Sequence, residues 1–116
     1  MSYKPILATS FKQSIKRLEK RFRNIKNDVS NAIKVLVENP KLGVAIPGGR
    51  GVRKLRVQNS DLARGKSGGY RLLYCIEDQP EPTLYLLLLY FKSHQEDVTQ
   101  KELQELLDEL RSEMGL

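Results

Sequence analysis

The sequence predicts an α+β domain in which a helical pair and a final helix pack on a mostly antiparallel sheet. Apolar residues recur every three or four positions over residues 11–37 and 103–114, which is the period of a helix. Residues 52–92 instead hold short apolar runs separated by polar, Gly- or Pro-containing stretches, which is typical of strands and turns. A chain of 116 residues has room for one such domain, spanning 1–116.

The first elements are expected to be a strand and two helices. Residues 3–8 form a short mixed apolar run that we expect to be a strand. The stretch 10–13, Ser-Phe-Lys-Gln, fits a capping box, so we expect Ser10 to cap the first helix. Either Asn27 or Asp28 is expected to cap the second helix, and the Asn-Pro pair at 39–40 to end it. Helices joined by so short a turn should pack as an antiparallel hairpin.

Three strands and a helix are expected after the Pro- and Gly-rich loop at 47–51. The first strand starts at Val52, and the next two cover 70–76 and 83–92 with a turn at 78–82. The unbroken leucines of the last strand predict a central strand that is buried on both faces. Residues 99–102, Thr-Gln-Lys-Glu, form a second capping box that opens the final helix. The predicted order is therefore β-α-α-β-β-β-α.

The charge of the chain is unevenly distributed. Residues 1–92 hold 18 Lys and Arg against 7 Asp and Glu, whereas residues 93–116 hold 2 against 7. A basic body of this kind favours a polyanionic ligand, although a basic surplus alone often only aids solubility. One cysteine, Cys75, and one histidine, His94, make neither an internal disulfide nor a structural zinc site, so no metal or cofactor is expected. With no signal-peptide pattern and no apolar run longer than eight residues, we expect a cytoplasmic protein with no membrane segment.

Familiar nucleotide and hydrolase motifs are excluded. The Gly-Lys-Ser at 65–67 lacks the preceding P-loop glycine, because that position holds Ser60. The glycines at 48–51 do not make a dinucleotide fingerprint, because position 54 is Lys. No nucleophile-elbow sequence is present, and the acidic residues are too scattered to favour metal hydrolysis.

The remaining candidate site is a group of cations on consecutive strands. Strand alternation places Lys54 and Arg56 on one face, and places Tyr90 and Lys92 together at the end of the last strand. A Gly-rich loop with two further cations is expected to fold over that face. A single Lys or Arg on a strand is usually only solvated, but several beside apolar strands favour a bound anion such as a phosphodiester. The cations are Lys54, Arg56, Arg71, Lys92, Arg64 and Lys66.

Such a site can cleave RNA without a metal. Attack of the ribose 2′-hydroxyl on its own phosphate needs a base, neutralisation of the developing charge and protonation of the 5′-oxygen. Arginine suits the second task because its planar fork matches phosphate oxygens. Crowded cations lower the pKa of a lysine, which lets one move a proton near neutral pH. Either Tyr74 or Tyr90 is a candidate to stack on a splayed base.

The same residues resemble a known family. The stretch 66–74, Lys-Ser-Gly-Gly-Tyr-Arg-Leu-Leu-Tyr, is similar to the signature strand of RelE-type toxins of the RelE/ParE superfamily. Residues 52–56 resemble the basic strand that precedes it, and residues 89–93 the last strand with its basic end. The helical hairpin and final helix fall in the expected order, so the resemblance covers nearly the whole chain. The sequence Gly-Lys-Ser-Gly-Gly-Tyr-Arg at 65–71 most resembles the HigB-type subgroup.

The resemblance implies the toxin of a type II toxin–antitoxin system. Such a toxin is an mRNA endonuclease that works in the ribosomal A site and is neutralised by an antitoxin, in this subgroup usually a helix-turn-helix protein. Contact with operator DNA would then run mainly through that partner. Residue by residue, the resemblance places Arg71 on the scissile phosphate. The matching basic positions are Lys54, Arg56, Lys66 and Lys92.

Two departures from the family pattern leave the acid and base open. Ser93 stands where many members have Arg, and residues 98–99, Val-Thr, stand where several have a catalytic Tyr. Tyr90, Tyr74 or His94 is a candidate to take the missing role. The residues expected to bind RNA are Arg56, Arg64, Tyr74, Tyr90 and His94.

Two rival functions fit the same fold. ParE-type relatives poison DNA gyrase and lack the nuclease cations, so the cations of this chain favour the nuclease. A module that only binds nucleic acid would show affinity with a steep salt dependence but no cleavage.

Overall fold

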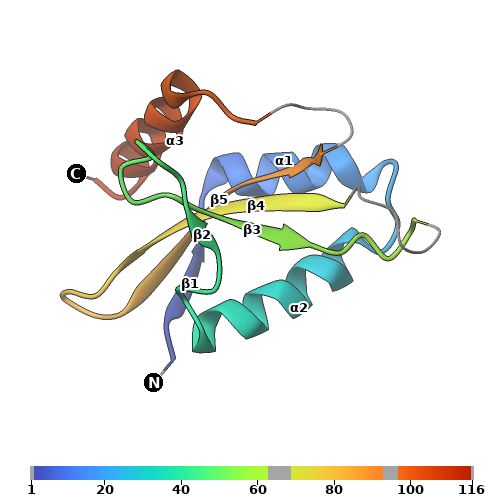
Figure 1. Ribbon diagram of the computed structural model, residues 1–116, viewed down its shortest axis with the longest axis horizontal. Helices are drawn as coiled ribbons and strands as arrows, with labels where there is room; N and C mark the ends of the chain where they lie inside the picture. The colour runs from blue at the N-terminus through green and yellow to red at the C-terminus, as the bar shows by residue number, and fades with distance from the viewer. Residues whose placement is uncertain (1, 63–68, 93–96, 116) are drawn as a thin grey trace.

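Five strands form one mixed sheet, and helices cover both of its faces (Figure 1). The structure is a computed structural model, and it describes residues 2–62, 69–92 and 97–115. Its elements are β1 (Lys4–Leu7), α1 (Thr9–Glu19), α2 (Ile25–Glu38), β2 (Val44–Ala45), β3 (Arg53–Val57), β4 (Tyr70–Glu77), β5 (Thr83–Phe91) and α3 (Gln100–Glu113). The predicted α+β class and element order are confirmed. The short β2, which pairs with the start of β3, was not expected.

The sheet order is β1-β5-β4-β3-β2, and only the β1–β5 pair is parallel. The leucine-rich strand predicted to be central is β5, and it does lie inside the sheet, between β1 and β4. Its leucines are buried towards both faces, as the unbroken apolar run indicated: Leu84, Leu86, Leu87 and Leu89 are each at most 1% exposed. An apolar run without polar alternation is stable only in such a doubly covered position.

The two faces of the sheet carry separate apolar cores. Helices α1 and α2 bring Phe11, Ile25 and Leu36 against one face, where they pack with residues such as Leu72 and Leu89. Helix α3 covers part of the other face with Leu103 and Leu110, which belong to the cluster of Leu73, Leu87 and Tyr90. In Figure 1 this helix lies over one end of the sheet. The other end of that face is where the predicted cations lie.

A β-bulge in β5 decides which of its residues reach the cation face. Leu73 pairs with Leu88, but the next residue of β4, Tyr74, pairs with Leu86, so Leu87 is an extra residue in β5. Leu87 and Leu88 consequently both belong to the cluster under α3. An extra residue reverses the alternation that follows it. The bulge thereby places Tyr90, and not Phe91, on the face of the cations.

The helix caps agree with the sequence only in part. Thr99 and Glu102 form the predicted capping box of α3, with hydrogen bonds in both directions. The expectation for Ser10 is wrong: α1 begins at Thr9, and the Ser10 hydroxyl donates to the carbonyl oxygen of Leu87 at 2.6 Å. The backbone N–H of Thr9 donates instead to the Glu113 carboxylate at 3.1 Å. A distant acid thus replaces the local cap.

The expected cap of the second helix is also wrong. Helix α2 begins at Ile25 with Asn24 at its cap position, three or four residues earlier than a cap at Asn27 or Asp28 would place it. The Asp28 carboxylate accepts hydrogen bonds from the backbone N–H and the hydroxyl of Ser60, at 3.0 and 3.1 Å. It therefore ties α2 to the segment after β3 and does not cap its own helix. The predicted end of this helix is confirmed, since α2 stops at Glu38, directly before the Asn-Pro pair.

Candidate anion-binding site

Two arginines face each other across the β3–β4 ladder. Arg56 is the direct partner of Arg71, and Arg71 is in turn the direct partner of Tyr90 on β5. Directly paired residues of antiparallel strands project from the same face, so these three side chains form a row across the sheet. Like charges in such a pair destabilise a sheet, which indicates that this row serves something other than stability.

Arg71 is the buried member of the row. Its side chain belongs to a residue that is only 6% exposed, and Nη1 donates to the backbone carbonyl oxygen of Tyr70 at 3.2 Å. Within the described part of the chain no carboxylate forms an ion pair with Arg71 or with Arg56. A guanidinium has five N–H donors and pairs best with a planar or tetrahedral oxyanion. The row therefore offers guanidinium donors with no carboxylate partner among the described residues, an arrangement that suits an oxyanion.

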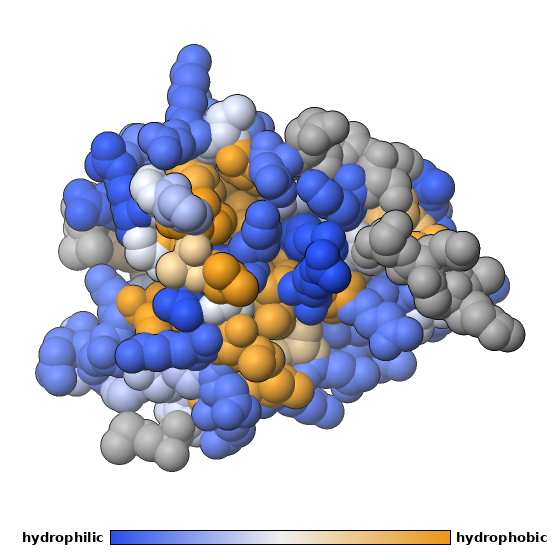
Figure 2. Space-filling view, viewed as in Figure 1, coloured by the Kyte–Doolittle hydropathy of each residue, from blue (hydrophilic) through white to orange (hydrophobic). Residues whose placement is uncertain are grey.

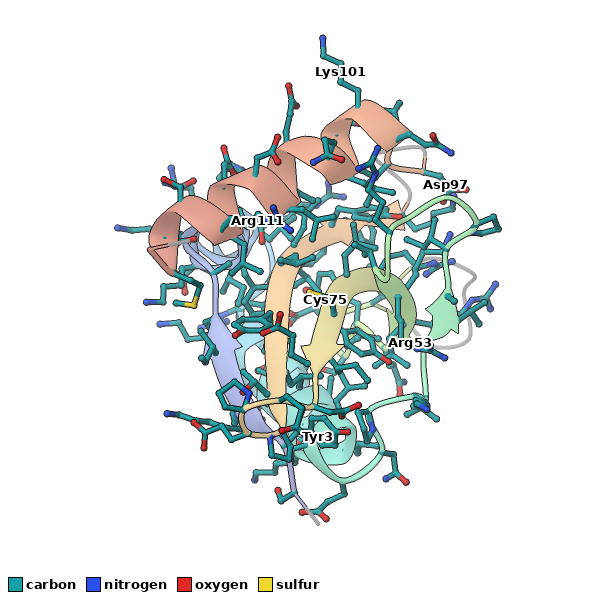
Figure 3. All side chains as sticks on the ribbon, turned by 90° about the vertical axis from the view of Figure 1, so that its left-hand side faces the viewer. Tyr3, Arg53, Cys75, Asp97, Lys101 and Arg111 are labelled. Atoms are coloured by element: carbon teal, nitrogen blue, oxygen red, sulfur yellow. The ribbon has the colours of Figure 1, made fainter. Side chains whose placement is uncertain are left out.

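Two lysines join the row and share one carboxylate oxygen. Lys54, on β3, and Lys92, directly after β5, place their Nζ atoms 3.2 and 3.4 Å from Oδ1 of Asp97. Hydrogen bonding from Lys54, with the charge of both lysines, lowers the pKa of Asp97 below its ordinary value. Asp97 thus remains a carboxylate at neutral pH and neutralises part of this cationic surface. Figure 3 shows it beside the N-terminal end of α3, at the opposite end of the helix from Arg111.

A cavity of about 430 Å³ brings these charges together. Its polar lining consists of Lys54, Arg56, Arg71, Lys92 and Asp97. Its apolar wall includes Leu42 and Val44, which are 54% and 72% exposed. In Figure 2 apolar side chains reach the surface in the middle of the view, next to strongly hydrophilic ones. Cations beside an exposed apolar wall can hold a phosphate and a neighbouring base at the same time.

Tyr90 contributes a buried hydroxyl to this region. The residue is 4% exposed, and its hydroxyl has no hydrogen-bond partner within the described part of the chain. Burial raises the pKa of Tyr90, Asp97 raises it further, and Arg71 opposes the shift. The hydroxyl is therefore protonated at neutral pH and is a hydrogen-bond donor. Its ring is too enclosed to stack on a base, which the sequence had offered as one of its roles.

Tyr74 lies on the opposite face of the sheet and is not part of the row. It is fully buried, so its ring has no free face for stacking on a base. Its hydroxyl donates to the carbonyl oxygen of Pro40 at 2.7 Å and accepts from the N–H of Gly43 at 2.9 Å. Arg53, its cross-strand partner, donates Nε to the carbonyl oxygen of Gly43 at 3.0 Å. Tyr74 and Arg53 thus fix residues 40–43, of which Leu42 and Gly43 line one wall of the cavity.

Glycine is required at position 43 by this close approach. A Cβ atom there would lie 2.9 Å from the backbone oxygen of Lys54 and 2.9 Å from the Tyr74 side chain. Any larger residue would push the wall away from β3. The separation between the apolar wall and the cations of β3 consequently depends on this glycine.

The structure brings together four of the predicted site residues and places one elsewhere. Lys54, Arg56, Arg71 and Lys92 line one cavity, with Tyr90 beside them. The remaining predicted residues, Arg64, Lys66 and His94, lie outside the described residues. Asp97 was missed, although it lies two residues before the predicted capping box, where the chain must return over the sheet.

No protein-family model matches the chain. None of the described helices is long and apolar enough to cross a membrane.

Proposed function

We propose that this protein is the toxin of a type II toxin–antitoxin system and cleaves mRNA on the ribosome without a metal ion. The observation that supports this best is the Arg56–Arg71 pair, two like charges with no acidic partner among the described residues. The resemblance to RelE-type toxins over residues 66–74 supplies the reaction class. Both arguments point to Arg71. It occupies the position of the signature arginine in the resemblance, and it lies between Arg56 and Tyr90 in the row across the sheet.

The proposed reaction is an internal transesterification. The ribose 2′-oxygen forms a bond to phosphorus as it loses its proton, and the bond from phosphorus to the 5′-oxygen breaks as that oxygen gains one. The products are a 2′,3′-cyclic phosphate and a 5′-hydroxyl. Arg71 and Arg56 neutralise the charge that develops on the non-bridging oxygens. The candidate proton-bearing groups are Lys54 and Lys92, which line this cavity, and the Tyr90 hydroxyl, whose residue lines a neighbouring pocket that Lys54 also lines.

A second surface suits the antitoxin. A groove of about 700 Å³ runs between β1, α1 and α2, with a floor that includes Ile15, Ile33 and Val37. Its rim carries Lys12, Lys16, Lys26 and Lys34, of which Lys26 pairs with Glu19, an acid of the same groove, at 3.5 Å. An amphipathic acidic segment is complementary to an apolar floor with a basic rim, and we propose that the antitoxin, a helix-turn-helix protein that also contacts operator DNA, supplies it. Lys16→Glu should weaken antitoxin binding without slowing RNA cleavage, whereas Lys20→Glu, outside the groove, should leave both unchanged.

The decisive experiment is induced expression in the bacterial cytoplasm of wild type, Arg71→Ala and the matched control Arg111→Ala. Protein and DNA synthesis are followed by pulse labelling, and new mRNA 5′ ends are mapped. We expect wild type and Arg111→Ala to stop translation and to produce new mRNA ends, and Arg71→Ala to do neither while it still binds antitoxin. Arrest of replication with intact mRNA would identify a gyrase poison instead. Nucleic-acid binding without any arrest would identify a binding module.

A further inference from the structure

The Asp97 carboxylate lies where the lysine pair can hold a phosphate oxygen. One atom, Oδ1, accepts from both Nζ groups, at 3.2 Å from Lys54 and 3.4 Å from Lys92. Lys54 lies on β3 and Lys92 directly after β5, the two strands on either side of β4, so the carboxylate bridges the sheet across Arg71's strand. A non-bridging phosphate oxygen shared by two ammonium groups would have the same contacts. The lysine pair is thus an anion subsite that a residue of the chain already fills.

Asp97 can leave this subsite without disturbing the fold. Its side chain is 64% exposed, whereas those of Lys54 and Lys92 are 32% and 34% exposed. The sheet carries Lys54 on β3 and Lys92 directly after β5, whereas Asp97 lies outside the sheet, two residues before the capping box that begins at Thr99. Ion pairs as exposed as these contribute little to stability. A phosphate that binds the two lysines therefore displaces Asp97 at little cost in free energy.

Among the described residues, Asp97 is also the one acid that lines the cationic cavity. Four cations line it with this carboxylate, which forms ion pairs with the two lysines but with neither Arg56 nor Arg71. Lys54 lies two residues before Arg56 on β3, a separation of about 6.6 Å. Successive phosphates of a single RNA strand are spaced comparably. The cavity hence offers two neighbouring anion subsites, of which one is filled from within.

We propose that Asp97 is an exchangeable internal anion that occupies a second RNA phosphate subsite, formed by Lys54 and Lys92, until single-stranded RNA displaces it. This rests on the proposed function, because the ligand is the RNA backbone at the same cavity. Asp97 then lowers the affinity of the site for RNA, because it must be displaced before the second phosphate binds. It takes no part in bond making or breaking.

The test compares Asp97→Asn with Glu105→Gln, which removes the same charge from an exposed position of α3 that lines none of the cavities described. The probe is a short fluorescent RNA with 2′-O-methyl groups, which binds but cannot be cleaved. Affinity is measured by anisotropy between 50 and 200 mM salt, values chosen as roughly the range over which phosphate contacts are lost. We expect Asp97→Asn to bind about fivefold more tightly than wild type, the effect of one unit charge at contact distance in water. The control should change by less than about twofold.

Two further readouts separate displacement from a general charge effect. The slope of log affinity against log salt should stay the same in Asp97→Asn, because RNA phosphates fill both subsites in either protein once Asp97 is displaced. In a Lys54→Met background the gain from Asp97→Asn should vanish, because the subsite is gone. Equal or weaker binding by Asp97→Asn, with wild type binding normally, would overturn the inference while leaving the proposed function intact. Absence of RNA binding by wild type and variant alike would overturn both.

Discussion

Arg56 and Arg71 stand opposite each other on one face of the β3–β4 ladder, and no acidic side chain among the described residues pairs with either. The arrangement costs stability in the free protein, since the guanidinium groups repel each other and Arg71 is largely desolvated. An oxyanion that bridges them removes both costs. Stability and ligand binding should therefore respond in opposite directions to substitutions in this row.

Replacing Arg71 with Met should make the protein more stable and inactive. The apolar side chain fills similar volume and removes the buried charge, so we expect the free energy of unfolding in urea to rise by about 1 kcal/mol. Cleavage of mRNA in a translation reaction should fall by about a hundredfold to a thousandfold, the usual effect of losing one donor that stabilises the developing charge. Arg111→Met, at the far end of α3, is the matched control. A variant that keeps full activity would contradict the proposed site.

Replacing Tyr90 with Phe should separate a chemical role of the hydroxyl from a structural one. The hydroxyl is buried without a partner among the described residues, so its loss should leave the free energy of unfolding unchanged or raise it by about 1 kcal/mol. If the hydroxyl donates to the reacting phosphate, cleavage should drop about a hundredfold. We expect both results. Normal cleavage by a stable Tyr90→Phe protein would exclude the hydroxyl from the reaction.

The carboxylate of Asp97 should titrate below the usual range of aspartates. Hydrogen bonding and charge from Lys54, together with the charge of Lys92, lower its pKa, so the folded state favours the ionised form. The stabilisation is therefore complete above the unfolded pKa of about 3.9 and is lost as pH falls through the lower folded value. Carbon-13 NMR of the side-chain carboxyl, recorded from neutral to acidic pH, measures this directly. Lys54→Met should move the midpoint back towards the ordinary value, and an unshifted midpoint in the wild type would show that the pairs do not form in solution.

Replacing Tyr74 with Phe should damage the cavity wall from the opposite face of the sheet. The variant loses the hydrogen bonds to Pro40 and Gly43 and leaves a buried N–H without its acceptor. We expect the free energy of unfolding to fall by about 1–3 kcal/mol. Tyr85→Phe, which loses one exposed hydrogen bond to Glu77, should cost less than about 1 kcal/mol. Equal losses in the two variants, measured by urea unfolding, would show that Tyr74 does not fix the wall.

Strand alternation was sufficient to predict the cation face but not its complete composition. The two-residue period placed Lys54 with Arg56, and their pairing with β4 follows once the strands are antiparallel. The same period puts Tyr74, three residues from Arg71, on the opposite face, so its burial there agrees with the alternation. The bulge could not be predicted, because four consecutive leucines contain no signal for which of them is the extra residue.

Long-range contacts account for the other differences. The stretch 10–13 matches a capping box, yet the Glu113 carboxylate reaches the start of α1 from 104 residues away. Local sequence also says nothing of Asp97, whose contacts depend on how the chain returns over the sheet between β5 and α3. In the sequence it belongs to an acidic segment, and only the fold places it on the lysines.

The parallel pairing of β1 with β5 has a consequence for the order in which this protein can assemble during synthesis. Lys4 finds its partner Thr83 only after most of the chain has been made, and the cap of Thr9 comes later still with Glu113. Pairings of such sequence separation form late and slow the folding of a domain. The cations of the proposed site are likewise spread over β3, β4 and the end of β5. A nascent chain therefore cannot carry the complete cation row until β5 has been made, late in the synthesis of the protein.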